Sequence, residues 1–177
     1  MKMPRGTIFI TILFVLLFFS SEIFESSAAN AYIPTVYLQK SQIYNKEESE
    51  LKCLTEVVYY EARDQSESGR VAVANVVLNR VYSHRFGGDN ICSVVHFRSD
   101  GVCEFSWVCH EHKVTESEAW KDAKEIAKKV LTKKVADNTH GSLFFIMKNM
   151  RKPAWTKKLM KVMVIEDHVF FKFNKDT

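Results

Sequence analysis

The sequence predicts an α+β protein in which a helical N-terminal part precedes a small C-terminal antiparallel sheet. Apolar residues recur at three- and four-residue spacing up to about residue 131, which is typical of helices that pack against a core. Beyond residue 141 the pattern changes to short runs rich in β-branched and aromatic residues. No internal repeat or low-complexity segment interrupts this order, so we expect one domain behind a short leader.

Residues 1–31 have the pattern of a secretory signal peptide. Lys2 and Arg5 precede an apolar run over residues 8–19, and the segment ends in Ala-Asn-Ala at residues 29–31. The apolar run is shorter than the roughly 20 residues that span a bilayer, so we expect cleavage rather than a signal anchor, the competing interpretation. The mature protein is then exported to the periplasm or the extracellular cell wall, without stable membrane insertion.

Residues 32–50 are predicted to be a lead-in segment, extended over residues 32–45, and residues 51–177 to be the folded domain. From about residue 46 the pattern becomes helical. Its three- and four-residue steps place Glu61 on the inward face of this helix, near the C-terminal end. The helix is expected to stop at the polar run that follows.

A second helix is expected over about residues 69–83, after a polar run over residues 64–69 in which Ser66 or Ser68 could cap it. This helix is apolar on nearly every face, which predicts that it is buried within the domain. Its length, its alanines and the absence of alternation favour a helix over a strand.

An irregular loop with a short strand or turn, rich in glycine, cysteine and aromatic residues, is expected over residues 98–113. Thr115 and Glu118 then fit a capping box that opens a third helix, which we expect to continue through Leu131. One face of this helix is apolar and the opposite face carries lysines, so we interpret the lysines as a solvated surface.

The C-terminal part predicts a small sheet. Residues 142–147 have the composition of a strand, and the runs 162–165 and 168–173 flank Glu166-Asp167 as a hairpin.

The formal net charge of +4 suits an anionic polymer as a partner. No nucleic-acid-binding motif accompanies the basic residues, and a signal peptide argues against contact with nucleic acid. We therefore expect no nucleic-acid partner, and a cell-wall glycan or a membrane surface fits the charge better. The protein is expected to be a monomer.

The exported part contains four cysteines: Cys53, Cys92, Cys103 and Cys109. An even number in an exported domain indicates disulfides, for which four cysteines allow three connectivities. Cys103 and Cys109 are close enough in sequence to close a small loop, which would leave Cys53 to pair with Cys92.

A zinc site is the alternative interpretation of this region, because Cys103, Cys109, His110 and His112 lie close together in the sequence. The spacing of the two cysteines is wider than in the usual zinc knuckle, and the histidines adjoin the second cysteine. We therefore favour disulfides, and expect neither a metal nor an organic cofactor.

Glu61 is the candidate catalytic residue. It follows Tyr59 and Tyr60 and precedes the buried helix, and an apolar setting raises the pKa of a carboxyl group by disfavouring its charged form. Cleavage of a glycosidic bond needs such a group to protonate the leaving oxygen. The competing interpretation is that Glu61 pairs with Arg63 or caps a helix end.

The run from Tyr59 to Arg63, with the helix from Gly69 to Val81, resembles the first motif of SleB-type cell wall hydrolases, the family that includes spore cortex-lytic enzymes. Further segments resemble later motifs of that family in the same order: Cys92-Ser93-Val94-Val95, Cys103 to Cys109, Thr139 to Phe145, Pro153-Ala154-Trp155 and Ile165 to Phe170. The resemblance covers about residues 51–173.

The resemblance implies a lysozyme-like fold, related to goose-type lysozyme and lytic transglycosylases. It also implies cleavage of peptidoglycan glycan strands between N-acetylmuramic acid and N-acetylglucosamine. Glu61 would serve as acid and then as base, because the 6-hydroxyl of the muramic sugar closes on its own anomeric carbon. The candidate substrate-binding residues are Tyr60, Gln65, Phe105, Ser106, Trp107, Thr139 and Phe144.

The chain departs from the family pattern where Asp64-Gln65 replaces the usual Gly-Glu and where Ser68 replaces a Glu. A peptidoglycan-binding homologue without turnover is therefore the alternative from a different functional class. The aromatic candidates could equally be core residues. We interpret His140 and His168 as structural rather than catalytic.

Overall fold

The computed structural model describes residues 35–174, so the predicted signal peptide over residues 1–31 lies outside the described part of the chain. The chain divides into two compact units, one ending at Gln42 and the other beginning at Ile43. Of the first unit, the described residues 35–42 are helical and exposed. None of the helices in the described range is long and apolar enough to cross a membrane.

The first described helix, α2, corrects the predicted extended lead-in. It runs over Thr35–Ala62, so residues 35–45 are helical and not extended. The early part lacks a periodic apolar stripe, which is why the sequence pattern did not indicate a helix there. The later part carries the predicted inward face, with Leu54, Val57 and Val58 fully buried.

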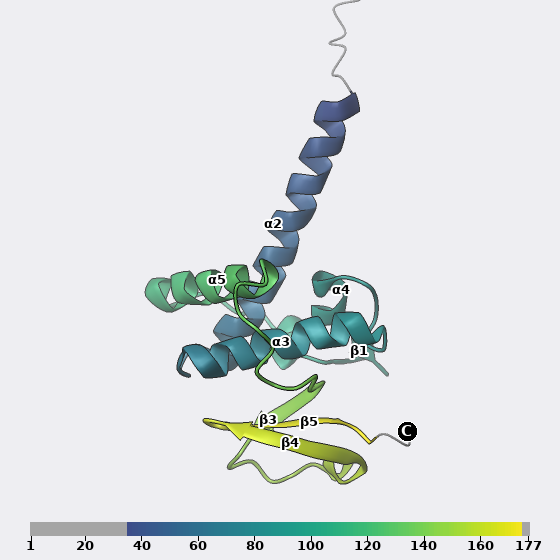
Figure 1. Cartoon of the computed structure of the whole chain (residues 1–177), viewed down its shortest axis with the longest axis vertical. Helices are drawn as coiled ribbons and strands as arrows, with labels where there is room; N and C mark the ends of the chain where they lie inside the picture. The colour runs from purple at the N-terminus through teal and green to yellow at the C-terminus, as the bar shows by residue number, and fades with distance from the viewer. Residues whose placement is uncertain (1–34, 175–177) are drawn as a thin grey trace, which may run out of the picture. The chain divides into compact units, whose positions relative to one another are not determined.

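Helix α3 is the central element of the second unit, as predicted from its apolar composition. Helix α3 spans Glu67–Ser83. The other helical elements of this unit are α4, Ile91–Val95; η1, Ser106–Cys109; α5, Ser117–Leu131; and η2, Ala154–Lys158. Helix α3 contacts α4, α5 and the strands β3 and β4 (Figure 1). Its valines and alanines are buried on all sides because every face has a covering element.

A three-stranded antiparallel sheet covers one side of α3. It consists of β3 (Phe144–Met147), β4 (Leu159–Ile165) and β5 (His168–Phe173) in the order β3-β5-β4. The predicted strand and the predicted hairpin are both confirmed. The short strands β1 (Arg98–Ser99) and β2 (Val102–Cys103) form a separate hairpin within the segment expected to be irregular.

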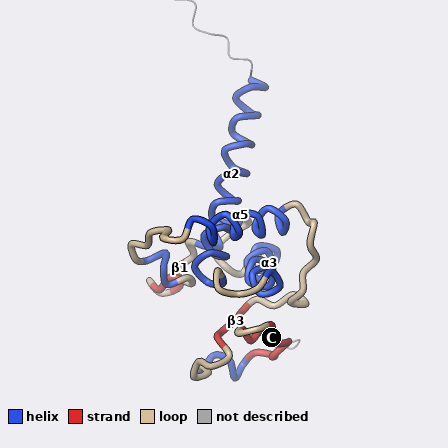
Figure 2. The backbone as a smooth tube through the Cα atoms, turned by 90° about the vertical axis from the view of Figure 1, so that its left-hand side faces the viewer, coloured by secondary structure: helices blue, strands red, loops and turns tan. Residues whose placement is uncertain are grey.

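Helix α3 lies between the other helices and the sheet (Figure 2). The apolar core occupies both of its sides, between the helices and, separately, against the sheet. Val73 and Val77 pack into the main cluster, which α2, α4 and α5 complete. Ala72 and Val76 face the other way, where they meet Phe170 of β5. Because apolar surface is buried on both sides of α3, this one helix holds the helical layer and the sheet together.

The two predicted helix caps are replaced by contacts from distant segments. Ser66 does precede α3, but its side chain makes no capping bond, and its backbone N–H donates to Glu166 Oε2 at 2.9 Å. The carboxylate of Glu166 therefore occupies the helix N-terminus, where negative charge is stabilised. The predicted capping box of α5 is wrong, because the N–H groups of Thr115 and Glu116 donate to the hydroxyl of Tyr59 instead, each at 3.1 Å.

Both disulfides of the favoured pairing are present. Cys53–Cys92 joins α2 to α4, and Cys103–Cys109 joins β2 to η1. The zinc interpretation is wrong, since both of its cysteines are oxidised. Over residues 35–174 no three histidine, cysteine or acidic side chains are grouped so that they could hold a metal ion.

Removing the Cys53–Cys92 disulfide by a double substitution to alanine is expected to lower the free energy of unfolding by about 4 kcal/mol, and removing Cys103–Cys109 by about 2 kcal/mol. The first bridge spans a sequence separation of 39 and the second a separation of 6, so the first restricts the unfolded chain more. Urea denaturation of the two double variants measures both losses. A larger loss from the Cys103–Cys109 variant would contradict this account.

Candidate functional site

Two adjoining cavities meet at the C-terminal end of α2. Their volumes are about 470 and 390 Å³, and both are lined by Tyr60, Glu61 and Arg63. The larger cavity lies between the end of α2 and the strands β3 and β5, while the smaller one lies between α2 and the η1 segment. We call the pair the Glu61 groove; Glu61 sits at the junction of its two halves.

The remaining residues that line the Glu61 groove come from four segments: Asp64, Phe145, Ile146, Met147, Met150 and His168 in the larger cavity, and Tyr59, Ser106, Trp107, His112, Lys113 and Thr115 in the smaller one. Glu61 thus has a cavity on each side.

Trp107 fixes the position of the Glu61 carboxyl group. Its indole Nε1–H donates a hydrogen bond to Glu61 Oε1 at 2.8 Å. The ring of Trp107 lies 4.8 Å from that of Tyr60, centroid to centroid, and only 8% of the residue is exposed. The Cys103–Cys109 disulfide closes the loop that carries Trp107, so the indole is held against the helix end.

Burial raises the pKa of Glu61 above its ordinary value of 4.5. The hydrogen bond from Trp107 and the positive charge of Arg80 act in the opposite direction, but desolvation is the larger effect. The protonated carboxyl group therefore persists to higher pH than an exposed glutamate. This is the property that a proton donor needs.

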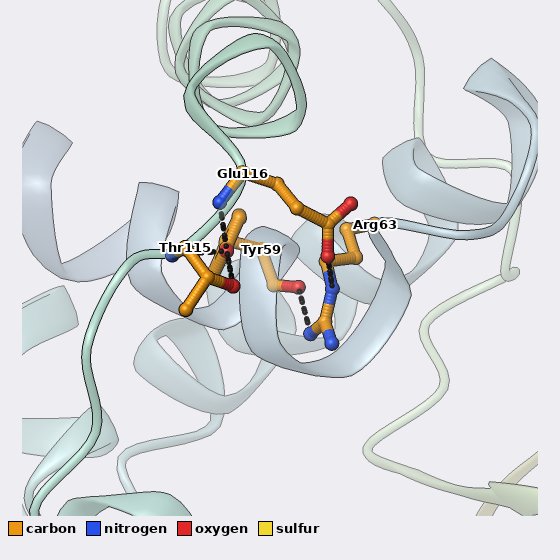
Figure 3. A network of polar contacts seen from close by, with 4 residues as sticks. All are labelled: Tyr59, Arg63, Thr115 and Glu116. Atoms are coloured by element: carbon orange, nitrogen blue, oxygen red, sulfur yellow. Dashed lines mark hydrogen bonds and ion pairs between the residues drawn. The ribbon is translucent and has the colours of Figure 1, made fainter.

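Arg63 pairs with Glu116 and not with Glu61, which removes the ion-pair part of the competing interpretation of the carboxyl group. The Arg63 guanidinium lies 3.1 Å from Glu116 Oε1 and donates to the Tyr59 carbonyl oxygen (Figure 3). In the same network the Tyr59 hydroxyl accepts from the backbone of Thr115 and Glu116. These contacts hold the start of α5 against the end of α2, so that the positive charge is neutralised away from Glu61.

The structure brings three of the predicted substrate-binding residues to the Glu61 groove. Tyr60, Ser106 and Trp107 line it, and the hydroxyl-bearing Ser106 is exposed. Phe144 lines a different cavity, of about 630 Å³.

Three other predicted substrate-binding residues are buried in contacts within the protein and do not line the Glu61 groove. Phe105 is 3% exposed in the core, and Thr139 is fully buried, where its hydroxyl donates to Asp137. Gln65 is 7% exposed; its side chain contacts Asp167, donating to Oδ2 at 3.4 Å and accepting from the backbone N–H at 3.3 Å. Gln65 therefore ties the start of α3 to the β4–β5 turn.

The sequence indicated Asp64 only as a nearby acid that could substitute for the missing glutamate of the family pattern, did not indicate His112 or Met150 as groove residues, and assigned His168 a structural role. His168 is 2% exposed, and burial lowers the pKa of its imidazole, so the neutral form is favoured. Its Nδ1 has no hydrogen-bond partner within residues 35–174. Only the adjacency of Asp64 to the Glu61 motif could have indicated one of these residues from sequence.

Comparison with known proteins places this geometry in context. The model of the cell wall hydrolase family matches residues 64–171, more than half of the chain, and Glu61 lies just before the matched segment. No curated protein sequence is significantly similar.

Two solved structures share the fold. The catalytic domain of the Bacillus cereus SleB protein aligns with a TM-score of 0.53 at 24% identity, covering 71% of this chain and 91% of that one. The catalytic domain of the germination-specific lytic transglycosylase SleB from Bacillus anthracis aligns with a TM-score of 0.55 at 27% identity, covering 70% and 93%. The predicted α+β, lysozyme-like fold is therefore confirmed.

Glu61→Gln is expected to stabilise the protein at neutral pH. Because burial raises the pKa of Glu61 in the folded state, the stability that the protonated group contributes is present at acidic pH. That contribution is lost as the pH rises through the folded-state pKa. Glutamine does not ionise, and its Oε1 can still accept the hydrogen bond from Trp107.

Thermal unfolding of wild type and Glu61→Gln at neutral and acidic pH measures this effect. The variant should have the higher Tm at neutral pH, and the difference should shrink on acidification. Glu48→Gln, an exposed substitution on the same helix, is the control and should show no such pattern. A wild type that is more stable than Glu61→Gln at neutral pH would contradict the argument.

Proposed function

The chain belongs to the cell wall hydrolase family and is a cell-wall-degrading enzyme, and we propose that Glu61 is its catalytic acid and base. The proposed substrate is the peptidoglycan glycan strand, cleaved between N-acetylmuramic acid and N-acetylglucosamine. The observation that carries the proposal is the Glu61 carboxyl group itself, desolvated and hydrogen-bonded to Trp107 at the junction of the two cavities.

In the first step, protonated Glu61 donates its proton to the bridging oxygen between two sugars. The bond from that oxygen to the anomeric carbon breaks, and positive charge develops on the muramic sugar. Trp107 holds Oε1, so Oε2 is left to face the substrate. The raised pKa keeps the group protonated until the sugar is bound.

In the second step, the Glu61 carboxylate accepts the proton of the 6-hydroxyl of the same muramic sugar. The 6-oxygen then bonds to the anomeric carbon, giving a 1,6-anhydro product and restoring protonated Glu61. One carboxyl group serves both steps, and no water is consumed. The SleB protein of Bacillus anthracis, which shares the fold, is described as a lytic transglycosylase, and this supports the proposed course.

Hydrolysis is the second candidate reaction, because Asp64 lines the same cavity as Glu61 and is exposed. A second carboxylate beside the acid could activate water or stabilise the charged sugar, as in glycosidases that use two carboxylates. The two reactions leave different chain ends: anhydro sugars from transglycosylation and reducing ends from hydrolysis.

We also propose that the protein acts outside the cytoplasm, as a monomer, after removal of residues 1–31. The two disulfides support this location, since disulfides persist in oxidising compartments. The lead-in over residues 32–50 then precedes a catalytic domain over residues 51–177. N-terminal sequencing of the secreted protein tests the cleavage site.

Glu61→Gln is expected to lower the rate of glycan cleavage by about 10²–10⁴, because the glutamine cannot donate or accept the proton. Binding to insoluble peptidoglycan should be retained, since the shape of the groove and the Trp107 contact are kept. Release of soluble muropeptides from purified cell walls measures cleavage, and co-sedimentation measures binding. Glu48→Gln is the control and should cleave at the wild-type rate; unchanged cleavage by Glu61→Gln would remove Glu61 from the mechanism.

Mass spectrometry of the products, combined with Asp64→Asn, separates the two candidate reactions. Transglycosylation predicts anhydro-muramic ends from the wild type and continued turnover by Asp64→Asn. Reducing ends, together with loss of turnover in Asp64→Asn, would instead establish hydrolysis with Asp64 as the second carboxylate. Binding without products from the wild type would identify a peptidoglycan-binding protein that lacks turnover.

A further inference from the structure

The cavity of about 630 Å³ that Phe144 lines adjoins the Glu61 groove, because Phe145 lines both. It lies where β2, β3, η2 and the end of β5 come together, on the far side of Phe145 from Glu61. Its volume falls within the range of about 300–1,000 Å³ that is usual for small-ligand sites. The catalytic steps described above do not use it.

An exposed aromatic surface forms one wall of this cavity. Trp155 of η2 is 43% exposed, and its ring lies 5.7 Å from that of Phe144. Phe173 packs edge-on against the other side of Phe144, at 5.2 Å between centroids. Phe86 also packs against Phe144, at 5.6 Å, so three rings hold Phe144 in place, and the partly exposed Trp155 indole supplies an apolar surface at the cavity.

A fixed carboxylate supplies the polar group. Glu104 lines the cavity with 27% of its side chain exposed, and its Oε2 lies 3.4 Å from Arg80 Nη1. Arg80 is itself immobilised, because its Nε donates to the Leu143 carbonyl oxygen at 2.8 Å and its guanidinium lies 4.7 Å from the centre of the Phe86 ring. The ion pair with the buried arginine places the Glu104 carboxylate at the cavity wall, where it can accept hydrogen bonds.

We infer that this cavity is a second saccharide-binding site, which takes an N-acetylhexosamine unit of the same glycan strand that Glu61 cleaves. Trp155 contacts the apolar face of the sugar ring, and Glu104 accepts hydrogen bonds from its hydroxyl groups. Apolar walls with a few fixed polar groups are typical of sites for neutral polar ligands. The inference rests on the proposed function, since the occupant is a further unit of the proposed substrate.

Because Phe145 lines both this cavity and the Glu61 groove, we expect the sugar unit bound here to belong to the same strand that crosses the groove. A polymer bound across Glu61 has further sugar units beyond the groove, and the cavity that shares Phe145 with it is in position to take one of them. Two cations and one carboxylate line the cavity, and Glu104 already compensates the charge of Arg80, which leaves Lys158 at the rim as a further hydrogen-bond donor to the hydroxyl and amide oxygens of a sugar. The second site would therefore increase affinity for long strands without taking part in bond cleavage.

The indole N–H resonances of the three tryptophans test this inference directly in ¹⁵N-labelled Glu61→Gln protein. Peptide-free glycan oligomers of N-acetylglucosamine and N-acetylmuramic acid are the probe. Trp107 and Trp155 should both shift on binding, while Trp120, which lines a separate cavity, should not. A shift of Trp107 without Trp155 would overturn the inference and leave the proposed function standing, whereas no shift at either would contradict both.

Trp155→Ala provides the kinetic test. Its kcat/KM on long glycan strands should fall about tenfold, because KM rises while kcat is retained. A loss of this size is typical when one aromatic side chain is removed from a binding site. Trp155→Phe, which keeps a ring, should lose less, and melting curves verify that both variants fold. Tyr82→Ala removes an aromatic residue that is 64% exposed and lines neither cavity, so it is the matched control.

The outcomes of the kinetic test separate the two proposals. If Trp155→Ala has the wild-type KM on long strands while Glu61→Gln is inactive, the second site is excluded and the catalytic assignment stands. If Glu61→Gln cleaves at the wild-type rate, the catalytic assignment fails whatever Trp155 does.

Discussion

Helix α3 has to be covered on every side, because its valines and alanines leave no face that water could solvate without cost. The helical layer formed by α2, α4 and α5 covers one side, and the sheet covers the other. Neither layer alone would bury the helix. At the end of α2 the helical layer and the sheet are not in full contact, and the larger cavity of the Glu61 groove lies between them there. The position of the candidate site therefore follows from how the central helix is buried.

The environment of Glu61 is set by effects that oppose one another. Burial disfavours the carboxylate, while the Trp107 hydrogen bond and the charge of Arg80 favour it, and burial is the stronger effect. Arg63, the nearest cation in sequence, is held by Glu116 and so does not stabilise the carboxylate. The result is a carboxyl group that stays protonated at higher pH than an exposed glutamate does. When this group ionises, the folded protein loses stability. Such a compromise is expected where a residue is selected for chemistry rather than for stability.

Much of the fold could be predicted from sequence, because helices and strands leave periodic patterns in the residues that pack against the core. The helices α3 and α5 with their C-terminal ends, the strand β3 and the β4–β5 hairpin all follow from such patterns, while the starts of the two helices differ by about two residues. Predictions that depended on a single local contact were less successful. Ser66 and the proposed capping box of α5 were plausible local partners, but Glu166 and Tyr59 make those contacts from far along the chain. Residues 35–45 were missed because an exposed helix needs no apolar stripe.

For the candidate site, the sequence alone identified Glu61, Tyr60, Ser106 and Trp107 through their motifs, and the even number of cysteines indicated the disulfides. Only the tertiary structure showed that Gln65 and Thr139 are buried, that Asp64 and His168 line the groove, and that a second cavity shares a wall with it. The physical reason is that a motif records which residue types occur together along the chain. Which side chain reaches which partner depends on how α2, the η1 segment and the sheet pack around α3, and that packing joins residues about 100 positions apart.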